Sequence, residues 1–132
     1  MSHPHYVHSL SGNIICVTDL GIDQVLFYER GKDWEEIGCL PLEPGCGPRH
    51  IEFDRTRQII YILNELSCDI VVVKYLNRYR CFEKLQSVNT LTSGFNGNNT
   101  GAAVRLSTDG RFLYASNRGS DKAALAVADG WL

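Results

Sequence analysis

The sequence has no long apolar run, since nowhere in its 132 residues do about 18 apolar residues follow one another. We therefore expect no membrane-spanning helix and no membrane partner. The first residues lack the basic patch and the apolar core of a secretory signal. An excess of positive charge is also missing, because the formal net charge is −2. Nucleic acid, which requires a basic surface, is therefore not an expected partner.

Cysteine pairs with the spacing of a metal knuckle are missing as well. The chain has five cysteines, an odd number, and no two of them are separated by two residues. We therefore expect free thiols in a reducing compartment, the cytoplasm, rather than a disulfide framework or a zinc knuckle. His3 and His5 could face one way in an extended chain, but no third ligand accompanies them. Neither a metal nor another cofactor is expected.

Helical periodicity is weak throughout the chain, whereas short runs rich in Ile, Val, Tyr and Phe recur along it. Three stretches align with one another, and each of them holds three such runs. These stretches cover residues 5–28, 50–73 and 103–127. Runs at 36–40 and 81–88 supply a fourth strand to the first two stretches. The repeated unit is therefore predicted to be a four-stranded antiparallel meander.

The length of the repeat indicates the architecture. The middle run of each unit ends at Asp19, Asn64 or Asn117, and these positions are 45 and 53 residues apart. Four-stranded propeller blades repeat about every 40–50 residues. We therefore predict an all-β fold, a β-propeller fragment of two to three four-stranded antiparallel blades. A single partial domain is expected over residues 1–132, with approximate blades at 3–40, 47–88 and 101–132.

The meander predicts which polar residues share one end of the sheets. The loop leading into the first strand of a unit and the corner between its second and third strands lie on the same rim. In the middle unit this rule brings Arg49 and His50 to the same rim as Asn64 and Glu65. The flanking units add His3, His5, Asp19, Asn117 and Arg118 to that rim.

The chemistry of this rim indicates an anionic small molecule. Arginine forks suit the oxygens of carboxylates and phosphates. A carboxylate beside them can take a proton from water, and a histidine can shuttle a proton near neutral pH.

Structural roles compete with this interpretation. A corner Asp or Asn often only hydrogen-bonds its own backbone, which applies to all three corner residues named above. Arg49 and Glu65 could form an ion pair that merely joins two loops. Cys46 lies near the same rim but has no adjacent base in the sequence, so we do not expect it to act as a nucleophile. In an extended strand His8 faces the opposite side from His3 and His5, so it is expected to be structural.

Five motifs, taken in order, resemble the lactonase family of seven-bladed β-propellers, which includes propeller-type 6-phosphogluconolactonases and carboxymuconate cyclases. The motifs are His3-Pro4-His5, residues 19–25, Gly47-Pro48-Arg49-His50, Asn64-Glu65-Leu66 and residues 106–119. The resemblance implies hydrolysis of an anionic sugar lactone such as 6-phosphogluconolactone. A carboxymuconate cyclase-type isomerase, and a non-catalytic fragment serving as a binding module, are the alternatives.

The resemblance also implies roles for individual residues. The histidine, two arginines and glutamate of the family's proposed active site correspond here to His5, Arg49, Glu65 and Arg118. The other polar residues of the rim are expected to contact the substrate, namely His3, Asp19, His50, Asn64 and Asn117. Because the stretch after His5 is one residue shorter than the family pattern, His3 is an alternative to His5.

A seven-bladed ring is longer than this chain, whose repeats account for two to three blades. A closed propeller leaves no strand edge bare. The resemblance therefore implies either a fragment of a lactonase-like protein or a short member that associates with copies of itself through exposed blade edges.

Overall fold

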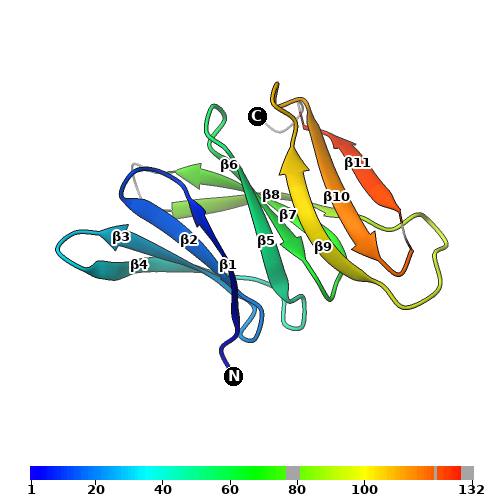
Figure 1. Ribbon diagram of the computed structural model, residues 1–132, viewed down its shortest axis with the longest axis horizontal. Helices are drawn as coiled ribbons and strands as arrows, with labels where there is room; N and C mark the ends of the chain where they lie inside the picture. The colour runs from blue at the N-terminus through cyan, green and yellow to red at the C-terminus, as the bar shows by residue number, and fades with distance from the viewer. Residues whose placement is uncertain (77–80, 121, 129–132) are drawn as a thin grey trace.

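Eleven β-strands in three antiparallel sheets make up the part of the chain that the computed structural model describes, residues 1–76, 81–120 and 122–128 (Figure 1). Within each sheet, neighbouring strands follow one another in chain order. The prediction of an all-β propeller fragment is therefore confirmed. Among the described residues, no helix has the length and apolar character needed to cross a membrane.

The three sheets correspond to the three repeats of the sequence. The first sheet contains β1 (Pro4–Ser9), β2 (Ile14–Asp19), β3 (Gln24–Arg30) and β4 (Trp34–Pro41). The second contains β5 (Pro48–Asp54), β6 (Ile59–Asn64), β7 (Asp69–Leu76) and β8 (Cys81–Asn89). The third contains β9 (Thr100–Leu106), β10 (Phe112–Arg118) and β11 (Ala123–Val127).

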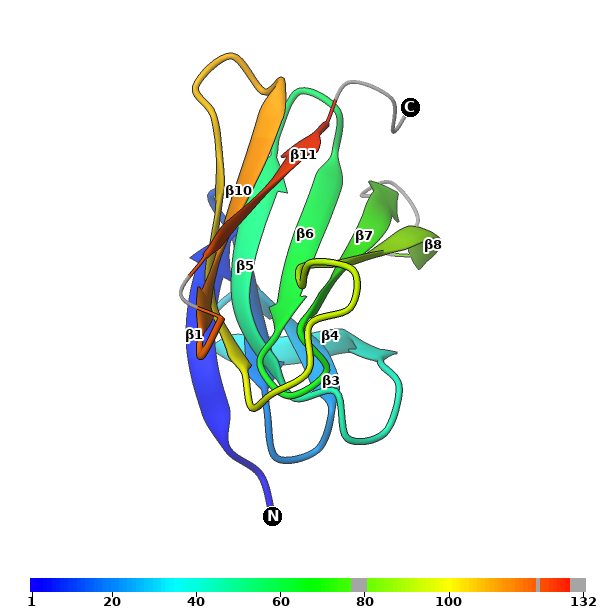
Figure 2. The same cartoon turned by 90° about the vertical axis from the view of Figure 1, so that its right-hand side faces the viewer.

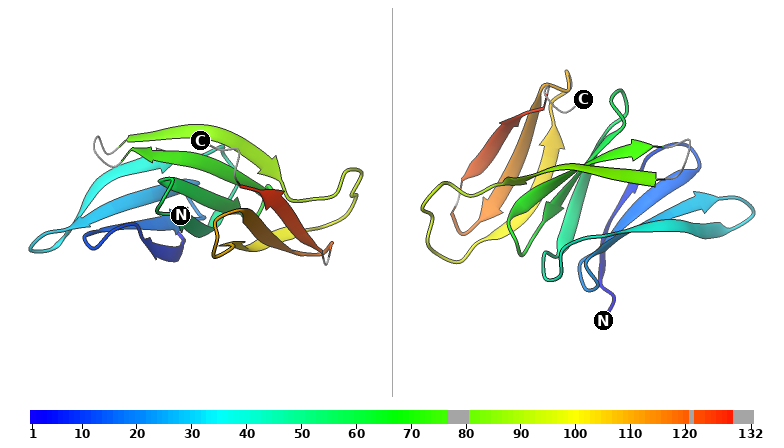
Figure 3. Two further views of the ribbon diagram at one scale, coloured as in Figure 1. Left: turned by 90° about the horizontal axis from the view of Figure 1, so that it is seen from above. Right: turned by 180° about the vertical axis from the view of Figure 1, so that it is seen from behind.

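The first strands of the three sheets lie side by side. β5 contacts β1 on one side and β9 on the other, as Figure 1 shows. Seen from behind, the last strands β4 and β8 lie at the front, on the opposite side of the molecule (Figure 3). Figure 2 looks onto the third sheet, with β11 in front of β10. This order matches a propeller in which the first strand of each blade lines the central channel.

Burial along the strands shows which faces are covered. Every residue of β6 is buried, because the first sheet covers one face of the second sheet and the third sheet covers the other. In β10 burial alternates: Leu113, Ala115 and Asn117 are buried, whereas Tyr114 and Ser116 are exposed. The third sheet is therefore covered on the face toward β6, and its other face is open in the described part of the chain.

Two apolar cores join the sheets. The core between the first and second sheets contains Phe27, whose ring stacks on those of Phe82 at 4.1 Å and Tyr75 at 6.2 Å. The core between the second and third sheets is smaller and includes Tyr61 and Leu113. Burial of such side chains contributes roughly 1.5–3 kcal/mol each, so both interfaces are held mainly by the hydrophobic effect.

At the end of the sheets opposite the predicted rim, the corner between β5 and β6 holds both neighbouring sheets. Arg55 Nη1 donates to the carbonyl of Leu10 in the first sheet at 2.8 Å. Arg57 Nη1 donates to the carbonyl of Gly110 in the third sheet at 2.5 Å, and Asp54 pairs with the same guanidinium at 3.0 Å. Two arginines of one corner thus bind to opposite neighbours.

Each first strand carries an irregularity at the same place. In β1, Pro4 pairs with Asp19 and Tyr6 with Thr18, so His5 is an extra residue. In β5, Pro48 pairs with Asn64 and His50 with Leu63, so Arg49 is the extra residue. In β9 the irregularity falls after Gly101, which pairs with Asn117. Such bulges redirect a side chain from the regular face of a strand, and here they fall at His5, at Arg49 and at one of Ala102 and Ala103.

The start of β9 packs closely against the corner that follows β6. A Cβ atom at Gly101 would lie 2.8 Å from the carbonyl oxygen of Asn64, and that backbone cannot easily give way. We predict that Gly101→Ala lowers the free energy of unfolding by about 1–3 kcal/mol, the usual cost of overpacking. Urea unfolding followed by fluorescence measures this change.

Gly12→Ala is the matched control for that experiment. No atom lies within 4 Å of a Cβ placed at Gly12, which sits in an exposed turn. Its free energy of unfolding should change by less than about 0.5 kcal/mol. Equal losses in the two variants would contradict the close approach at Gly101.

Candidate functional site

The corner after β6 places the carboxylate of Glu65 on the predicted rim. The backbone N–H of Glu65 donates to the carbonyl of Gly47 at 2.7 Å, and its own carbonyl accepts from the N–H of Gly101 at 2.9 Å. The corner is therefore fixed between the segment leading into β5 and the start of β9. Both neighbours are glycines, which lets the backbones approach closely.

Glu65 pairs with two arginines from different sheets. Its Oε2 lies 3.2 Å from Nε of Arg49, and its Oε1 accepts from Nη2 of Arg118 at 2.9 Å. The contact with Arg49 Nε lacks the alignment of a hydrogen bond, so it is an ion pair only. The Arg49 and Glu65 side chains are 21% and 20% exposed, whereas the Arg118 side chain is 54% exposed. The structure thus brings three of the four predicted catalytic residues together.

His3 and His5 of the first unit take no part in these ion pairs among the described residues. His3 precedes β1, His5 is the extra residue within it, and both are exposed. Within the described residues neither imidazole makes a hydrogen bond or an ion pair, and no group of three His, Cys, Asp or Glu side chains could hold a metal ion. The catalytic role of His5 and the substrate contact of His3 stay predictions.

Two of the corner residues of the sheets are held by loop contacts. Asp19 accepts hydrogen bonds from the Ser2 hydroxyl and from the backbone N–H of His3 at 2.6 Å. Burial alone would raise the pKa of Asp19, but these bonds outweigh it and lower the pKa. Asn117 accepts from Thr90 Oγ1 at 3.0 Å in the loop before β9. Their predicted substrate contacts stay predictions.

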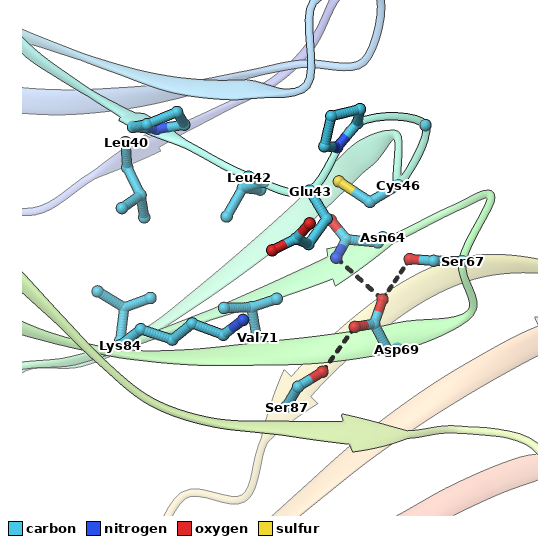
Figure 4. Close-up of a pocket in the computed structure, with 14 residues that line it drawn as sticks. Leu40, Leu42, Glu43, Cys46, Asn64, Ser67, Asp69, Val71, Lys84 and Ser87 are labelled. Atoms are coloured by element: carbon cyan, nitrogen blue, oxygen red, sulfur yellow. Dashed lines mark hydrogen bonds between the residues drawn. The ribbon is translucent and has the colours of Figure 1, made fainter.

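A cavity of about 410 Å³ lies on the other side of the Asn64 corner, between the segment before β5 and the second sheet (Figure 4). Asp69 faces it and accepts hydrogen bonds from Asn64 at 3.0 Å and from Ser87 at 2.6 Å. The Ser67 hydroxyl donates to the same carboxylate. These bonds outweigh the effect of burial and lower the pKa of Asp69. Because its carboxylate is already bound by the protein, and Arg49 and Glu65 do not line the cavity, the candidate site is the rim.

The thiol of Cys46, which also lines that cavity, is unsuited to nucleophilic chemistry. Burial and the nearby Asp23 and Asp69 carboxylates raise its pKa to about 12. Since the thiolate is the nucleophilic form, this cysteine stays protonated near neutral pH.

His50 lies at the centre of the three first strands. Its ring is 4.2 Å from that of Tyr6 in β1, and its Nδ1 accepts from the N–H of Val104 in β9 at 3.1 Å. Nε2 lies 3.0 Å from Nη1 of Arg105. Burial, with Arg105 next, lowers the pKa of His50 to about 4, so the imidazole is neutral near pH 7. His50 is 6% exposed, and its predicted substrate contact stays a prediction.

Side chains of β5 bind the edge of β9 that faces away from β10. Arg49 Nη1 donates to the carbonyl of Ala102, and the N–H groups of Val104 and Leu106 donate to His50 and to Glu52 Oε2. An inner strand has no further strand to pair with on this side, so its backbone groups need such partners. The polar residues of β5 supply them.

A second level of ionisable residues lies below the rim, and of its members sequence reasoning considered only His8, as a structural residue. His8, Glu52 and Arg105 pair with Cys16, Tyr61 and Tyr114. Each of these partners lies three residues before the corner residue of its unit, Asp19, Asn64 or Asn117. They therefore occupy equivalent positions in the three sheets. The repeat gave no clear signal for this level, because the aligned stretches begin at residues 5, 50 and 103 and the three residues lie at unequal distances from those starts.

Comparisons with a family model and with individual proteins point to the same family. Residues 1–130 match the family model described as lactonase, 7-bladed β-propeller. A 6-phosphogluconolactonase of Bacillus subtilis is 35% identical over 126 residues, which cover 93% of this chain and 36% of that protein. This chain thus spans a little over one third of the length of that relative.

Solved structures show the same likeness. A protein from Lactobacillus plantarum superposes with a TM-score of 0.90 at 38% identity, covering 96% of this chain and 38% of that chain. The periplasmic gluconolactonase PpgL of Pseudomonas aeruginosa superposes with a TM-score of 0.83 at 30% identity, covering 97% and 38%.

The neutral state of His50 predicts a loss of stability in acid. In the unfolded chain the pKa is about 6.5, so the unfolded state binds the proton more tightly than the folded state with its pKa of about 4. The contribution of neutral His50 to the free energy of unfolding is therefore fully present above a pH of about 6.5. The free energy of unfolding falls by about 3 kcal/mol as the pH decreases to 4. Urea unfolding at a series of pH values measures this.

His50→Gln is the comparison for that series. Glutamine can still accept from the N–H of Val104 but does not titrate, so the variant should lose less stability between pH 6.5 and 4. Parallel stability curves for the two proteins would show that another group causes the acid sensitivity.

Proposed function

This chain belongs to the lactonase family of seven-bladed β-propellers, and on that premise we propose that the protein hydrolyses an anionic sugar lactone, with 6-phosphogluconolactone as the favoured substrate. The name of the Bacillus subtilis relative supports the phosphorylated lactone. The observation that carries the proposal is the carboxylate of Glu65 held between Arg49 and Arg118 on one rim.

The three charges fit lactone hydrolysis. Together they amount to one net positive charge, which suits the oxyanion that forms when water attacks the lactone carbonyl. Arg118 is the more exposed arginine, so it can exchange its contact with Glu65 for an oxygen of the substrate. That exchange frees Oε1 of Glu65 to accept a proton.

The reaction then proceeds in two proton transfers. Glu65 takes a proton from water as the water oxygen bonds to the carbonyl carbon. The carbonyl oxygen becomes the oxyanion, and Arg49 and Arg118 stabilise it. When the oxyanion collapses, the bond to the ring oxygen breaks, and that oxygen receives a proton from protonated Glu65 or from His5. The product is the open hydroxy acid, and no redox step or cofactor is required.

We assign the reaction to the cytoplasm. Cys16, Cys39, Cys46 and Cys68 are free thiols, as expected in a reducing compartment. One of the similar structures is a periplasmic gluconolactonase, so the alternative is export to the periplasm. Cell fractionation followed by detection with an antibody to the protein distinguishes the cytoplasm from the periplasm.

Replacing Glu65 tests the catalytic assignment. Glu65→Gln keeps the shape of the side chain but cannot take a proton, so kcat for 6-phosphogluconolactone should fall by about 10²–10⁴-fold. For the unchanged protein and for the variant, a pH indicator follows the release of the acid product, and the uncatalysed rate is subtracted from both.

The control for that measurement is Glu36→Gln, which removes the same charge from an exposed position on β4. Its rate should equal that of the unchanged protein. Equal rates for Glu65→Gln and the unchanged protein would remove Glu65 from the mechanism.

A further inference from the structure

We propose that Arg105 and His50 form a phosphate subsite one level below the Glu65 ion pairs, where they bind the phosphate group of a phosphorylated lactone. The assignment rests on the proposed lactonase function and adds a part to it: the rim handles the lactone group, and this lower level distinguishes phosphorylated from unphosphorylated substrates.

The first observation is a pair of donors without an acceptor. A neutral imidazole has one N–H and one acceptor nitrogen. Nδ1 of His50 accepts from the N–H of Val104, so the ring proton is on Nε2. Nε2 therefore faces Nη1 of Arg105, another donor, at 3.0 Å. Within the described residues nothing accepts the Nε2 proton, although the side chain is only 6% exposed.

A phosphate oxygen resolves this conflict. Placed beside both groups, within hydrogen-bond distance of each, it accepts from Nε2–H of His50 and from the guanidinium of Arg105 together. Arg105 is exposed, and Nη1 alone makes its contacts with His50 and with the carbonyl of Val104 at 3.2 Å. Within the described residues its Nε and Nη2 have no partner, so a fork remains for two further phosphate oxygens.

The charges point to the same level for the phosphate. Arg49 and Arg118 both pair with Glu65, which leaves one net positive charge for a lactone oxyanion and none for a phosphate dianion. Arg105 forms no ion pair among the described residues, so its charge is available.

The neighbouring ionisable groups do not prevent anion binding. Glu52, the carboxylate of this level, accepts from the N–H groups of Phe53 at 3.1 Å and Leu106 at 3.2 Å, so both of its oxygens are engaged. His8 is half-buried, and burial lowers its pKa. The Glu52 carboxylate acts against this and raises the pKa, whereas the positive charges of Arg55 and Arg105 lower it. The level therefore favours an anion through Arg105.

The spacing of the two levels fits one substrate. Arg49 donates to the carbonyl of Ala102 and Arg105 to that of Val104, two residues further along the same edge of β9. Two residues of a regular strand span about 6.6 Å, and the irregularity between Gly101 and Val104 makes this an upper bound. A six-carbon sugar lactone with its phosphate on the carbon farthest from the carbonyl has a comparable reach. It can place its carbonyl at Arg49 and its phosphate at Arg105.

The test compares two substrates in the same protein sample. We measure kcat/KM for 6-phosphogluconolactone and for the unphosphorylated gluconolactone in the natural protein and in Arg105→Gln. The ratio of the two values should fall roughly 10- to 100-fold, the effect of losing a charge-assisted hydrogen bond or two. Because both rates come from one preparation, a partly unfolded variant lowers both equally and leaves the ratio unchanged.

Two further variants sharpen the result. Arg30→Gln removes the same charge from an exposed residue at the end of β3, and its ratio should equal that of the natural protein. Glu52→Gln removes the negative charge next to the subsite, so its ratio should rise. An unchanged ratio in Arg105→Gln, or the same fall in Arg30→Gln, would overturn the subsite.

A binding measurement separates this inference from the proposed function. Calorimetry compares 6-phosphogluconate with gluconate, which differ only in the phosphate. If neither lactone is hydrolysed, the proposed function fails, but tighter binding of 6-phosphogluconate that Arg105→Gln abolishes would still support the subsite. Equal affinity of the natural protein for the two acids would overturn it.

Discussion

The unpaired edge of β9 is the constraint on which the candidate site depends. An inner propeller strand pairs on one side only, and bare N–H and C=O groups on its other side cost free energy. Arg49, His50 and Glu52 of β5 bind those groups directly. The side chains that give this surface its chemistry therefore also join the second blade to the third. The position of Arg49 is set by its hydrogen bond to the edge of β9.

The site residues come from two structural positions that the repeat supplies once per blade. The extra residue of the first strand is His5 in the first blade, Arg49 in the second and an alanine, Ala102 or Ala103, in the third. The residue after the buried corner is Leu20, Glu65 or Arg118. Each blade offers the same two places to the rim, and only the side chain differs. The third blade has alanine at the first place, so it contributes a backbone carbonyl there and an arginine at the second.

Strand order and the shared rim could be predicted because they depend on local patterns, namely short apolar runs and a repeat of blade length. The level containing Glu52 and Arg105 could not. Both lie within strands, where alternation assigns a side chain to one face of a sheet. Their contacts instead join β5 and β9, so these contacts form only when the two blades are assembled. The unpaired Nε2–H of His50 likewise depends on contacts between blades.

The corner between β5 and β6 has a consequence for how the molecule comes apart. Arg55 holds the first blade and Arg57 the third, while β6 is buried against both. In linear repeat proteins each unit contacts its neighbours through separable interfaces and can fray from an end. Here one short turn takes part in both interfaces at once. Unfolding of the middle blade therefore breaks its interfaces with both neighbouring blades in a single cooperative event.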